Sequence, residues 1–337
     1  MALRVGRHTV FTENPISIAG FAAIGSKKES EGPLGNNFDI INEDSTFGED
    51  SWEKAESTMQ KLAVEKALDK AQYNKEDIDY IMAGDLLNQC ISSTYGLKEL
   101  KIPFVGLYGA CSTMAESIGV ASMMIEANAA KRCVAVTSSH FCSAERQFRF
   151  PLEYGGQRTT TSQWTATASG AVVLERNENL PYIKAVTFGT IEDLGVKDAN
   201  NMGAAMAPAA AETIKRFFDD TKTSIDDYDM LFTGDLGKVG STLLRELLLQ
   251  DGIDLKDRYN DCGLMLYDLE NQDVNAGGSG CGCSASVLCS TILNQMKNRE
   301  LNNILFIATG ALMSTTSSQQ GETIPSIAHL IYISNKL

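Results

Sequence analysis

The order of apolar and polar positions repeats once along the chain, as a helix, a short strand and then Gly-Asp-Leu. In the first copy, residues 58–71 carry apolar side chains at helical spacing, and Gly84-Asp85-Leu86 follows the strand. In the second copy, residues 209–218 form the helix, and Gly234-Asp235-Leu236 follows the strand. A motif that returns with the same neighbours indicates an internal duplication.

A second pair of segments follows each copy. Ala110-Cys111-Ser112 opens an Ala- and Met-rich helix before an apolar strand, and Gly280-Cys281-Gly282-Cys283 opens a helix that also precedes a buried strand. Strands that alternate with helices predict parallel β-α-β units and a sheet covered by helices. We therefore predict two homologous α/β halves, residues 1–176 and 177–337.

The duplication indicates where a site would form. In such a sheet the functional crevice lies beyond the carboxyl ends of the strands. Asp85, Cys111, Asp235 and Cys281 all fall at that edge. We predict one site shared by the two halves.

Composition limits the partners. The 337 residues include 43 acidic and 29 basic side chains, for a formal net charge of −14, which disfavours adhesion to nucleic acid or to an anionic bilayer. We expect no secretory signal, because no apolar stretch precedes a small-residue cleavage site, and no transmembrane segment, because the apolar runs are short. Eight cysteines in such a chain predict free thiols in a reducing compartment.

Cys111 is the candidate reactive residue. It stands at the predicted first turn of a helix, where free N–H groups and the macrodipole would lower the pKa of the thiol. A nucleophile is one interpretation. A small buried apolar residue is the other, and the position of Cys111 leaves both open.

Residues 106–118, Gly-Leu-Tyr-Gly-Ala-Cys-Ser-Thr-Met-Ala-Glu-Ser-Ile, resemble the nucleophile motif of the thiolase and ketoacyl-synthase superfamily. The resemblance covers essentially the whole chain. It implies a five-layered α-β-α-β-α fold and a homodimer. Function has to be judged from the site.

The chain departs from the condensing enzymes of that superfamily, which pair the cysteine with a His and with a second His or an Asn. Where the His is expected, the sequence is Thr233-Gly234-Asp235-Leu236, and the glycine turn at residues 277–285 lacks the Asn. A cysteine without a base or oxyanion donors is poorly equipped for Claisen chemistry. Of three His residues, only His140, at the end of a strand, is placed to face the crevice; a hydrogen-bonded structural role for it stays open.

Residues 137–158 place Arg146, Arg149 and Arg158 among aromatic side chains. Arg pairs with carboxylates and stacks on rings, so this segment suits a flat aromatic anion. A dimer-interface loop with salt bridges to Glu145 and Glu153 is the alternative. Cys281 and Cys283 have no second Cys or His pair at zinc-ligand spacing, so we expect no metal, and we expect no cofactor.

The same segment, with residues 277–285, resembles a thiolase-like family of sporulation proteins found in spore-forming Firmicutes. The resemblance implies a noncatalytic protein that binds dipicolinic acid (pyridine-2,6-dicarboxylate), free or as its calcium chelate, in a pocket resembling the thiolase active site. It further implies membrane channel subunits of the same operon as partners, uptake of dipicolinate into the forespore and its release at germination. The protein would lie in the spore, peripherally associated with the inner membrane.

We predict that Cys111 lines the pocket, with helix N–H groups binding one carboxylate of the ligand. The full set of predicted ligand-binding residues is Cys111, His140, Arg149, Arg158, Asp235, Gly280, Cys281 and Gly282. In this set Gly280 and Gly282 allow close approach of the backbone, and Arg149 or Arg158 supplies charge. The alternative function is an acyl-thioester condensing or acyl-transfer enzyme with Cys111 as nucleophile and His140 as a displaced base.

Overall fold

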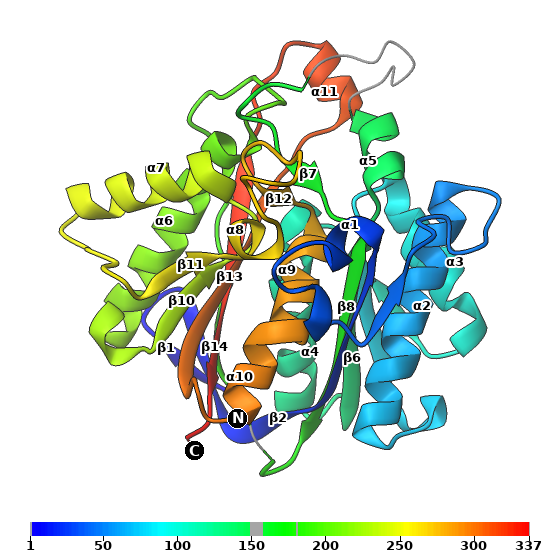
Figure 1. The fold of residues 1–337 in the computed structure, drawn as a ribbon. Coiled ribbons are helices and arrows are strands. Elements are labelled where there is room, and N and C mark those ends of the chain that lie inside the picture. Colours follow the sequence, from blue (N-terminus) through cyan, green and yellow to red (C-terminus); the bar gives the residue numbers. More distant parts are fainter. Residues whose placement is uncertain (1, 149–157, 180, 337) are drawn as a thin grey trace.

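Twelve strands join into one twisted sheet in the computed structural model of the chain, which describes residues 2–148, 158–179 and 181–336 (Figure 1). A separate two-stranded sheet pairs β7 with β12. The strands are β1 Leu3–Val5, β2 Thr9–Ser26, β3 Ile40–Asn42, β4 Tyr80–Gly84, β5 Phe104–Gly106, β6 Arg132–Ser139, β7 Trp164–Thr165, β8 Ala168–Arg176, β9 Tyr182–Thr187, β10 Met230–Thr233, β11 Tyr259–Asp261, β12 Gly278–Ser279, β13 Asn303–Ala311 and β14 Ser326–Ser334.

Both halves of the chain arrange their strands in the same order. The first half reads β5-β4-β6-β8-β2 and the second reads β11-β10-β13-β14-β9. In each half the first three strands of this order are parallel and the last two join antiparallel. The parallel β-α-β units predicted from the sequence are therefore present. The domain boundary between residues 176 and 177 coincides with the end of β8 and stays a prediction.

Helices cover the sheet from outside and fill its middle. The α-helices are α1 Lys27–Ser30, α2 Trp52–Ala71, α3 Ile91–Leu97, α4 Thr113–Glu126, α5 Phe141–Phe148, α6 Met202–Thr221, α7 Gly237–Gln250, α8 Cys262–Leu266, α9 Cys281–Val287, α10 Leu293–Lys297 and α11 Thr315–Gln319. A π-helical turn, Leu288–Ile292, joins α9 to α10.

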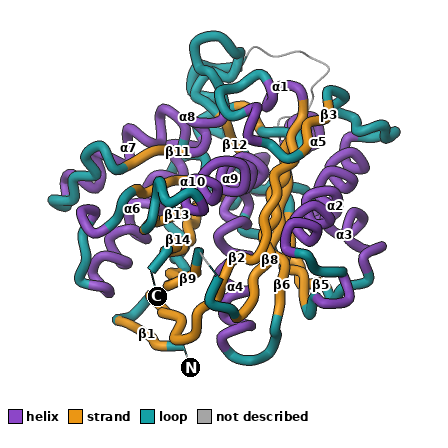
Figure 2. The backbone as a smooth tube through the Cα atoms, turned by 60° about the horizontal axis from the view of Figure 1, so that its bottom comes forward, coloured by secondary structure: helices purple, strands orange, loops and turns teal. Residues whose placement is uncertain are grey.

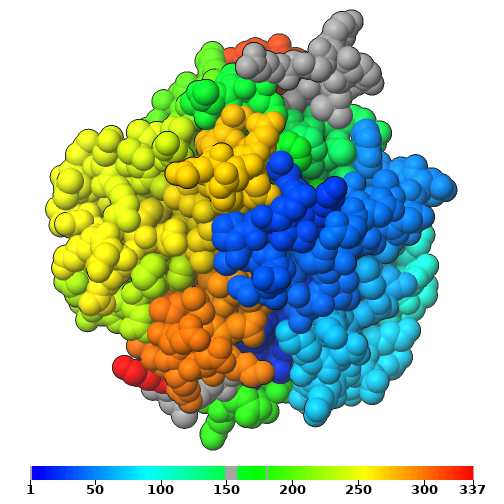
Figure 3. All heavy atoms as spheres, viewed as in Figure 1, coloured from blue at the N-terminus to red at the C-terminus, as the bar shows by residue number. Residues whose placement is uncertain are grey.

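Five layers result from this arrangement. Helices α2 and α3 cover the sheet of the first half, and α6 and α7 cover that of the second. Helices α4, α9 and α10 stand between the two sheet halves, as Figure 2 shows. The two β layers are continuous, because the long strand β2 pairs with β8 along one part and with β9 along another. In the space-filling view, the blue and cyan surface of early residues meets the yellow and orange surface of late residues along one seam (Figure 3).

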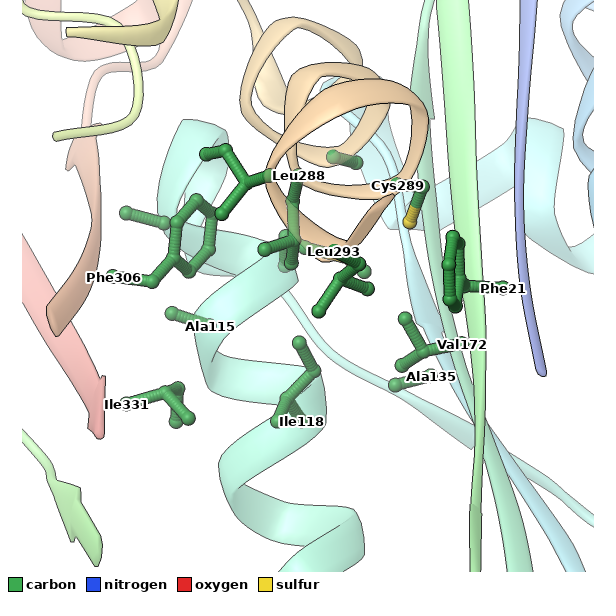
Figure 4. Packing of buried hydrophobic residues seen from close by; sticks show 14 of the residues in the cluster. Phe21, Ala115, Ile118, Ala135, Val172, Leu288, Cys289, Leu293, Phe306 and Ile331 are labelled. Atoms are coloured by element: carbon green, nitrogen blue, oxygen red, sulfur yellow. The ribbon is translucent and has the colours of Figure 1, made fainter. Parts of the chain in front are cut away.

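The largest hydrophobic cluster occupies the central layer (Figure 4). Ile118 of α4 and Leu293 of α10 lie between Val172 of one sheet half and Phe306 of the other, and all four side chains are fully buried. Burying apolar side chains from both halves in one cluster couples their stability, since each half covers the apolar face of the other.

The predicted helices begin earlier in the structure than in the sequence pattern. Helix α2 starts at Trp52, where the side chain of Ser51 accepts a hydrogen bond from the Lys54 backbone, and α6 starts at Met202 after Asn201, which caps it in the same way. Polar caps accept hydrogen bonds from the N–H groups of the first helical turn that have no partner within the helix. Both helices therefore begin before the residues whose apolar spacing predicted them.

Two further features bear on chemistry. All eight cysteines are free thiols. No helix in the described part of the chain has the length and apolar character needed to span a bilayer.

Candidate functional site

A pocket opens at the carboxyl ends of the strands, between the two halves of the chain. About 530 Å³ of space free of protein atoms lies in it, which includes open solvent at its mouth. Its lining residues come from both halves: Leu86, Tyr108, Ala110, Cys111, Ala144, Glu145, Phe148, Thr165, Met202, Met206, Ser279, Ala311 and Met313. The prediction of one shared site at this edge of the sheet agrees with this position.

Cys111 lines the pocket, as predicted, from a three-residue 3₁₀ turn, Ala110–Ser112, that precedes α4. The left-handed backbone of Ala110, with φ of 50°, sets the turn. Cys111 is only 9% exposed, and its thiol lies near enough to the Asp235 carboxylate for the charge of that group to affect the pKa of the thiol.

The prediction of a lowered pKa for Cys111 is wrong. Burial first, and then the negative charge of Asp235, raise the pKa of the Cys111 thiol well above its usual value. The positive end of α4 cannot offset this, because removing a thiolate from water costs more than the partial charge of a helix terminus returns. Burial and the neighbouring carboxylate therefore favour the protonated thiol of Cys111.

Asp235 lies behind the pocket wall and not on it. Its Oδ2 accepts hydrogen bonds from the Gly280 backbone N–H at 2.8 Å and from Ser279 Oγ at 3.2 Å, and its Oδ1 accepts one from Thr309 Oγ1 at 3.0 Å. Burial raises the pKa of Asp235 to about 7, against the lowering effect of its hydrogen bonds. Asp235 was predicted to contact the ligand; in the structure it is not among the lining residues, and it supports Ser279, which does line the pocket.

Gly280 and Gly282 permit close approach, but of the protein's own backbone. A Cβ on Gly282 would lie 2.2 Å from the Ala168 carbonyl oxygen, and one on Gly280 would lie 2.6 Å from Ser139 Oγ. Gly280 also has a φ of +96°, which side chains rarely adopt. Neither glycine is among the pocket-lining residues, so the prediction that a ligand approaches them is wrong. They instead allow α9 to pack tightly on β6 and β8.

Cys281 lies below the pocket floor. It is fully buried in a cluster with Leu86, Ala110 and Cys111, and its Sγ donates to the Ser138 carbonyl at 2.9 Å. Burial raises the pKa of its thiol well above the usual value. It packs beneath the site, and it does not line the pocket.

His140 does not reach the pocket, contrary to its predicted place. Its Nε2 donates to the Ser45 carbonyl oxygen at 2.9 Å, and its Nδ1 accepts from the Cys142 backbone N–H at 3.2 Å, so both ring nitrogens are occupied. Burial lowers the pKa of His140. The imidazole lines a different hollow, beside Lys28 and Trp164, because the loop at Ser45 holds it there. The alternative interpretation of His140, a hydrogen-bonded structural role, fits this geometry.

The two predicted arginines have different outcomes. Arg158 lies over the Trp164 ring, 5.0 Å from its centroid, and its Nη1 donates to the Asp273 carbonyl oxygen at 3.3 Å. It is not among the pocket-lining residues. Arg149 lies outside the described residues.

Sequence reasoning missed most of the lining. Met202 and Met206 come from the start of α6 and Met313 from the segment after β13, and no local signal marked them. Tyr108 and Ser279 stand inside the two motifs that carried the resemblance, so adjacency to Cys111 and to the glycine turn could have indicated them. Among the described residues that line the pocket there is neither a His nor an Asn.

Solved structures with similar folds place this arrangement in a known class. Xanthomonas campestris OleA bound to cerulenin has a TM-score of 0.62 at 15% identity, with 96% of this chain and 97% of that chain covered. Aquifex aeolicus 3-oxoacyl-[acyl-carrier-protein] synthase III has a TM-score of 0.57 at 13% identity, with 95% and 99% covered. The duplicated sheet, the central helices and the cysteine at the pocket define a thiolase-like protein. At these identities the likeness establishes the fold alone.

The sequence comparison is more specific. A sequence model of stage V sporulation protein AD matches residues 6–334. The protein of that name from Bacillus subtilis (strain 168) is 46% identical over 324 residues, which cover 96% of each chain. The chain therefore belongs to the stage V sporulation protein AD family.

Proposed function

We propose that this protein is a noncatalytic sporulation protein that binds dipicolinic acid, free or as its calcium chelate, in the pocket over Cys111. In this role it supports the uptake of dipicolinate into the forespore and its release on germination. The observation that carries the proposal is the composition of the pocket: a cysteine whose thiol pKa is raised by burial and by the charge of Asp235, and no imidazole among the described lining residues.

The lining suits a small ring with polar substituents. Leu86 and Ala144 of the first half and Met202, Met206 and Met313 of the second offer apolar contacts, and thioethers contact aromatic rings favourably. The lining also contains the hydroxyl groups of Tyr108, Thr165 and Ser279 and the carboxyl group of Glu145. A pyridine ring bearing two carboxylates likewise combines an apolar ring with polar groups.

This arrangement disfavours the first step of acyl transfer, in which a thiolate attacks the thioester. A thiol with a raised pKa must lose its proton before it attacks a thioester, and the carboxylate beside it opposes the thiolate. His140, the displaced base of the alternative function, has both ring nitrogens bound elsewhere.

The partners we propose are the membrane channel subunits of the same operon, with the chain peripherally associated with the inner membrane of the spore, and a second copy of the chain. The edge of the large sheet supports the homodimer. Strand β5 ends the strand order, and Phe104 on it and Tyr95 on the neighbouring α3 are 41% and 57% exposed. Light scattering of the Phe104→Lys variant tests this: the homodimer predicts a shift to monomer, and an unchanged mass rules out this edge.

Titration calorimetry of the purified protein with dipicolinate tests the main proposal. Titrations with and without equimolar calcium measure both forms of the ligand, and pyridine-2-carboxylate (picolinate) is the control with one carboxylate. Saturable binding of dipicolinate that picolinate does not match supports a pocket for two carboxylates. Absence of heat with both forms of dipicolinate would contradict binding by the isolated chain.

A further inference from the structure

The hydrogen atom of one polar group on the pocket wall is already committed. The Ser279 hydroxyl donates to the Asp235 carboxylate at 3.2 Å, and the charge of the same carboxylate adds to burial in raising the pKa of the Cys111 thiol. A hydroxyl has one hydrogen, so Ser279 offers a ligand only a lone pair. Redirecting that hydrogen would remove a partner from a fully buried carboxylate, which is costly.

Two other lining hydroxyls are differently placed. Among the described residues, the hydroxyls of Tyr108 and Thr165 make no hydrogen bond to a protein acceptor, although both side chains line the pocket. Each hydroxyl therefore has a hydrogen to offer.

The backbone holds Thr165 in place. It is the second residue of β7 and pairs with Ser279 of β12, so its position is tied to that of the Asp235 cluster. Its methyl group faces Gly280, since a Cβ on that glycine would lie 3.2 Å from Thr165 Cγ2. The side chain is 6% exposed, and the hydroxyl is a fixed donor on the wall.

Tyr108 carries the second of these hydroxyls. It lies three residues before Cys111 and is 43% exposed, so it borders the pocket where ligands enter. Burial of its ring raises the pKa of the phenol above the usual value. The group thus keeps its hydrogen throughout the physiological range and donates rather than repels a carboxylate.

We propose that the hydroxyls of Tyr108 and Thr165 donate the hydrogen bonds that bind the two carboxylates of the ligand, while Cys111 and Ser279 shape the wall between them and Asp235. Carboxylates accept only, and bonds from neutral donors to a charged acceptor are stronger than those between neutral groups. The inference rests on the proposed function, and it replaces Cys111 with these two hydroxyls as the groups that recognise the ligand's charge.

Calorimetric titration of dipicolinate into Tyr108→Phe and Thr165→Val tests this, because both substitutions remove a hydroxyl and keep the shape. Each variant is expected to bind roughly tenfold to a hundredfold more weakly than the wild-type protein, the loss typical of one hydrogen bond to a charged group. Tyr80→Phe, on β4 and outside the pocket, is the matched control and is expected to bind like wild type.

Thr165→Ser keeps the hydroxyl and is expected to restore binding if Thr165→Val loses it, which separates the donor from the packing of β7. Ser279→Ala is expected to weaken binding less than Thr165→Val, because the Ser279 hydrogen is directed at Asp235. Wild-type affinity in both Tyr108→Phe and Thr165→Val, with dipicolinate bound by the wild-type protein, would overturn this inference and leave the proposed function intact. A wild-type protein that binds no dipicolinate would instead overturn the proposed function, and the inference with it.

Discussion

Replacing Gly282 by Ala tests whether this glycine is needed for packing or for ligand binding. Gly282 lies in the first turn of α9, where the helix meets the ends of β6 and β8. An added Cβ would lie 2.2 Å from the Ala168 carbonyl oxygen, 2.6 Å from Ser139 Oγ and 2.8 Å from the Ser139 backbone nitrogen. Two of these three atoms are backbone, and they belong to different strands.

The size of the effect follows from those distances. A methyl carbon and a carbonyl oxygen approach to about 3.3 Å at closest, so α9 or β8 would have to move by about 1 Å. Both elements are fully buried at this point, and strands within a sheet cannot shift singly without breaking ladder hydrogen bonds. Overpacking typically costs about 1–3 kcal/mol. We expect Gly282→Ala to lower the free energy of unfolding by about 3 kcal/mol.

Gly106→Ala is the matched control. Gly106 lies on the exposed edge strand β5, and the nearest atoms to an added Cβ belong to the Phe104 ring, at 3.1 and 3.5 Å. That side chain is exposed and can turn away. The substitution should change stability by less than about 1 kcal/mol, since the loss of chain entropy in the unfolded state acts in its favour.

Urea unfolding followed by circular dichroism measures both variants, and calorimetry with dipicolinate measures whether the folded fraction still binds. If Gly282 serves packing, Gly282→Ala should unfold at a lower urea concentration and should still bind dipicolinate below its urea midpoint. A variant as stable as Gly106→Ala that no longer bound dipicolinate would refute the packing argument, and would return Gly282 to the ligand-binding role first predicted for it.

Three further outcomes follow from the buried acids and thiols. Iodoacetamide should alkylate Cys111 slowly at pH 7.5. The Asp235→Asn variant should react about tenfold faster or more, because lowering the pKa of the thiol by one unit raises the thiolate fraction tenfold. Peptide mass spectrometry measures both rates, and equal rates would contradict the role of Asp235. Intact-mass measurement after incubation with acetyl- or malonyl-thioesters should show no adduct, whereas an adduct on Cys111 would establish the acyl-enzyme alternative. Burial and the charge of Asp85 raise the pKa of Glu56 to about 8, so the folded state holds a proton that the unfolded chain releases above about 4.5. Stability should therefore fall between pH 5 and 8, by at most about 1.4 kcal/mol per pH unit from this group, and Glu56→Gln should flatten that slope in urea unfolding.

The fold could be predicted from local patterns because the same sequence of helix, strand and motif occurs in both halves of the chain. The two Gly-Asp-Leu motifs stand at the ends of β4 and β10, and each follows a helix whose apolar positions keep a helical period. Strand order then follows from parallel connections. Helix starts were misjudged, because Ser51 and Asn201 act as caps outside the apolar pattern.

The site could be located but not described from the sequence. Its position follows from strand ends, and Cys111 does line it. The chemistry of Cys111 depends on Asp235, which comes from the other half of the chain, and the orientation of His140 depends on the carbonyl of Ser45. The methionines of the lining reach the pocket from α6 and from the segment after β13. Contacts between segments so distant in sequence leave no periodic signal, so they became visible only with the fold.

The aspartates of the two matching motifs have different partners, although both side chains are fully buried. Asp85 accepts hydrogen bonds from the Leu87 and Ser93 backbone N–H groups and from the Ser93 hydroxyl. Asp235 accepts hydrogen bonds from Ser279, Gly280 and Thr309. Of these partners Ser279 lines the pocket, so the motif of the second half supports the pocket wall, whereas the motif of the first half stabilises its own loop.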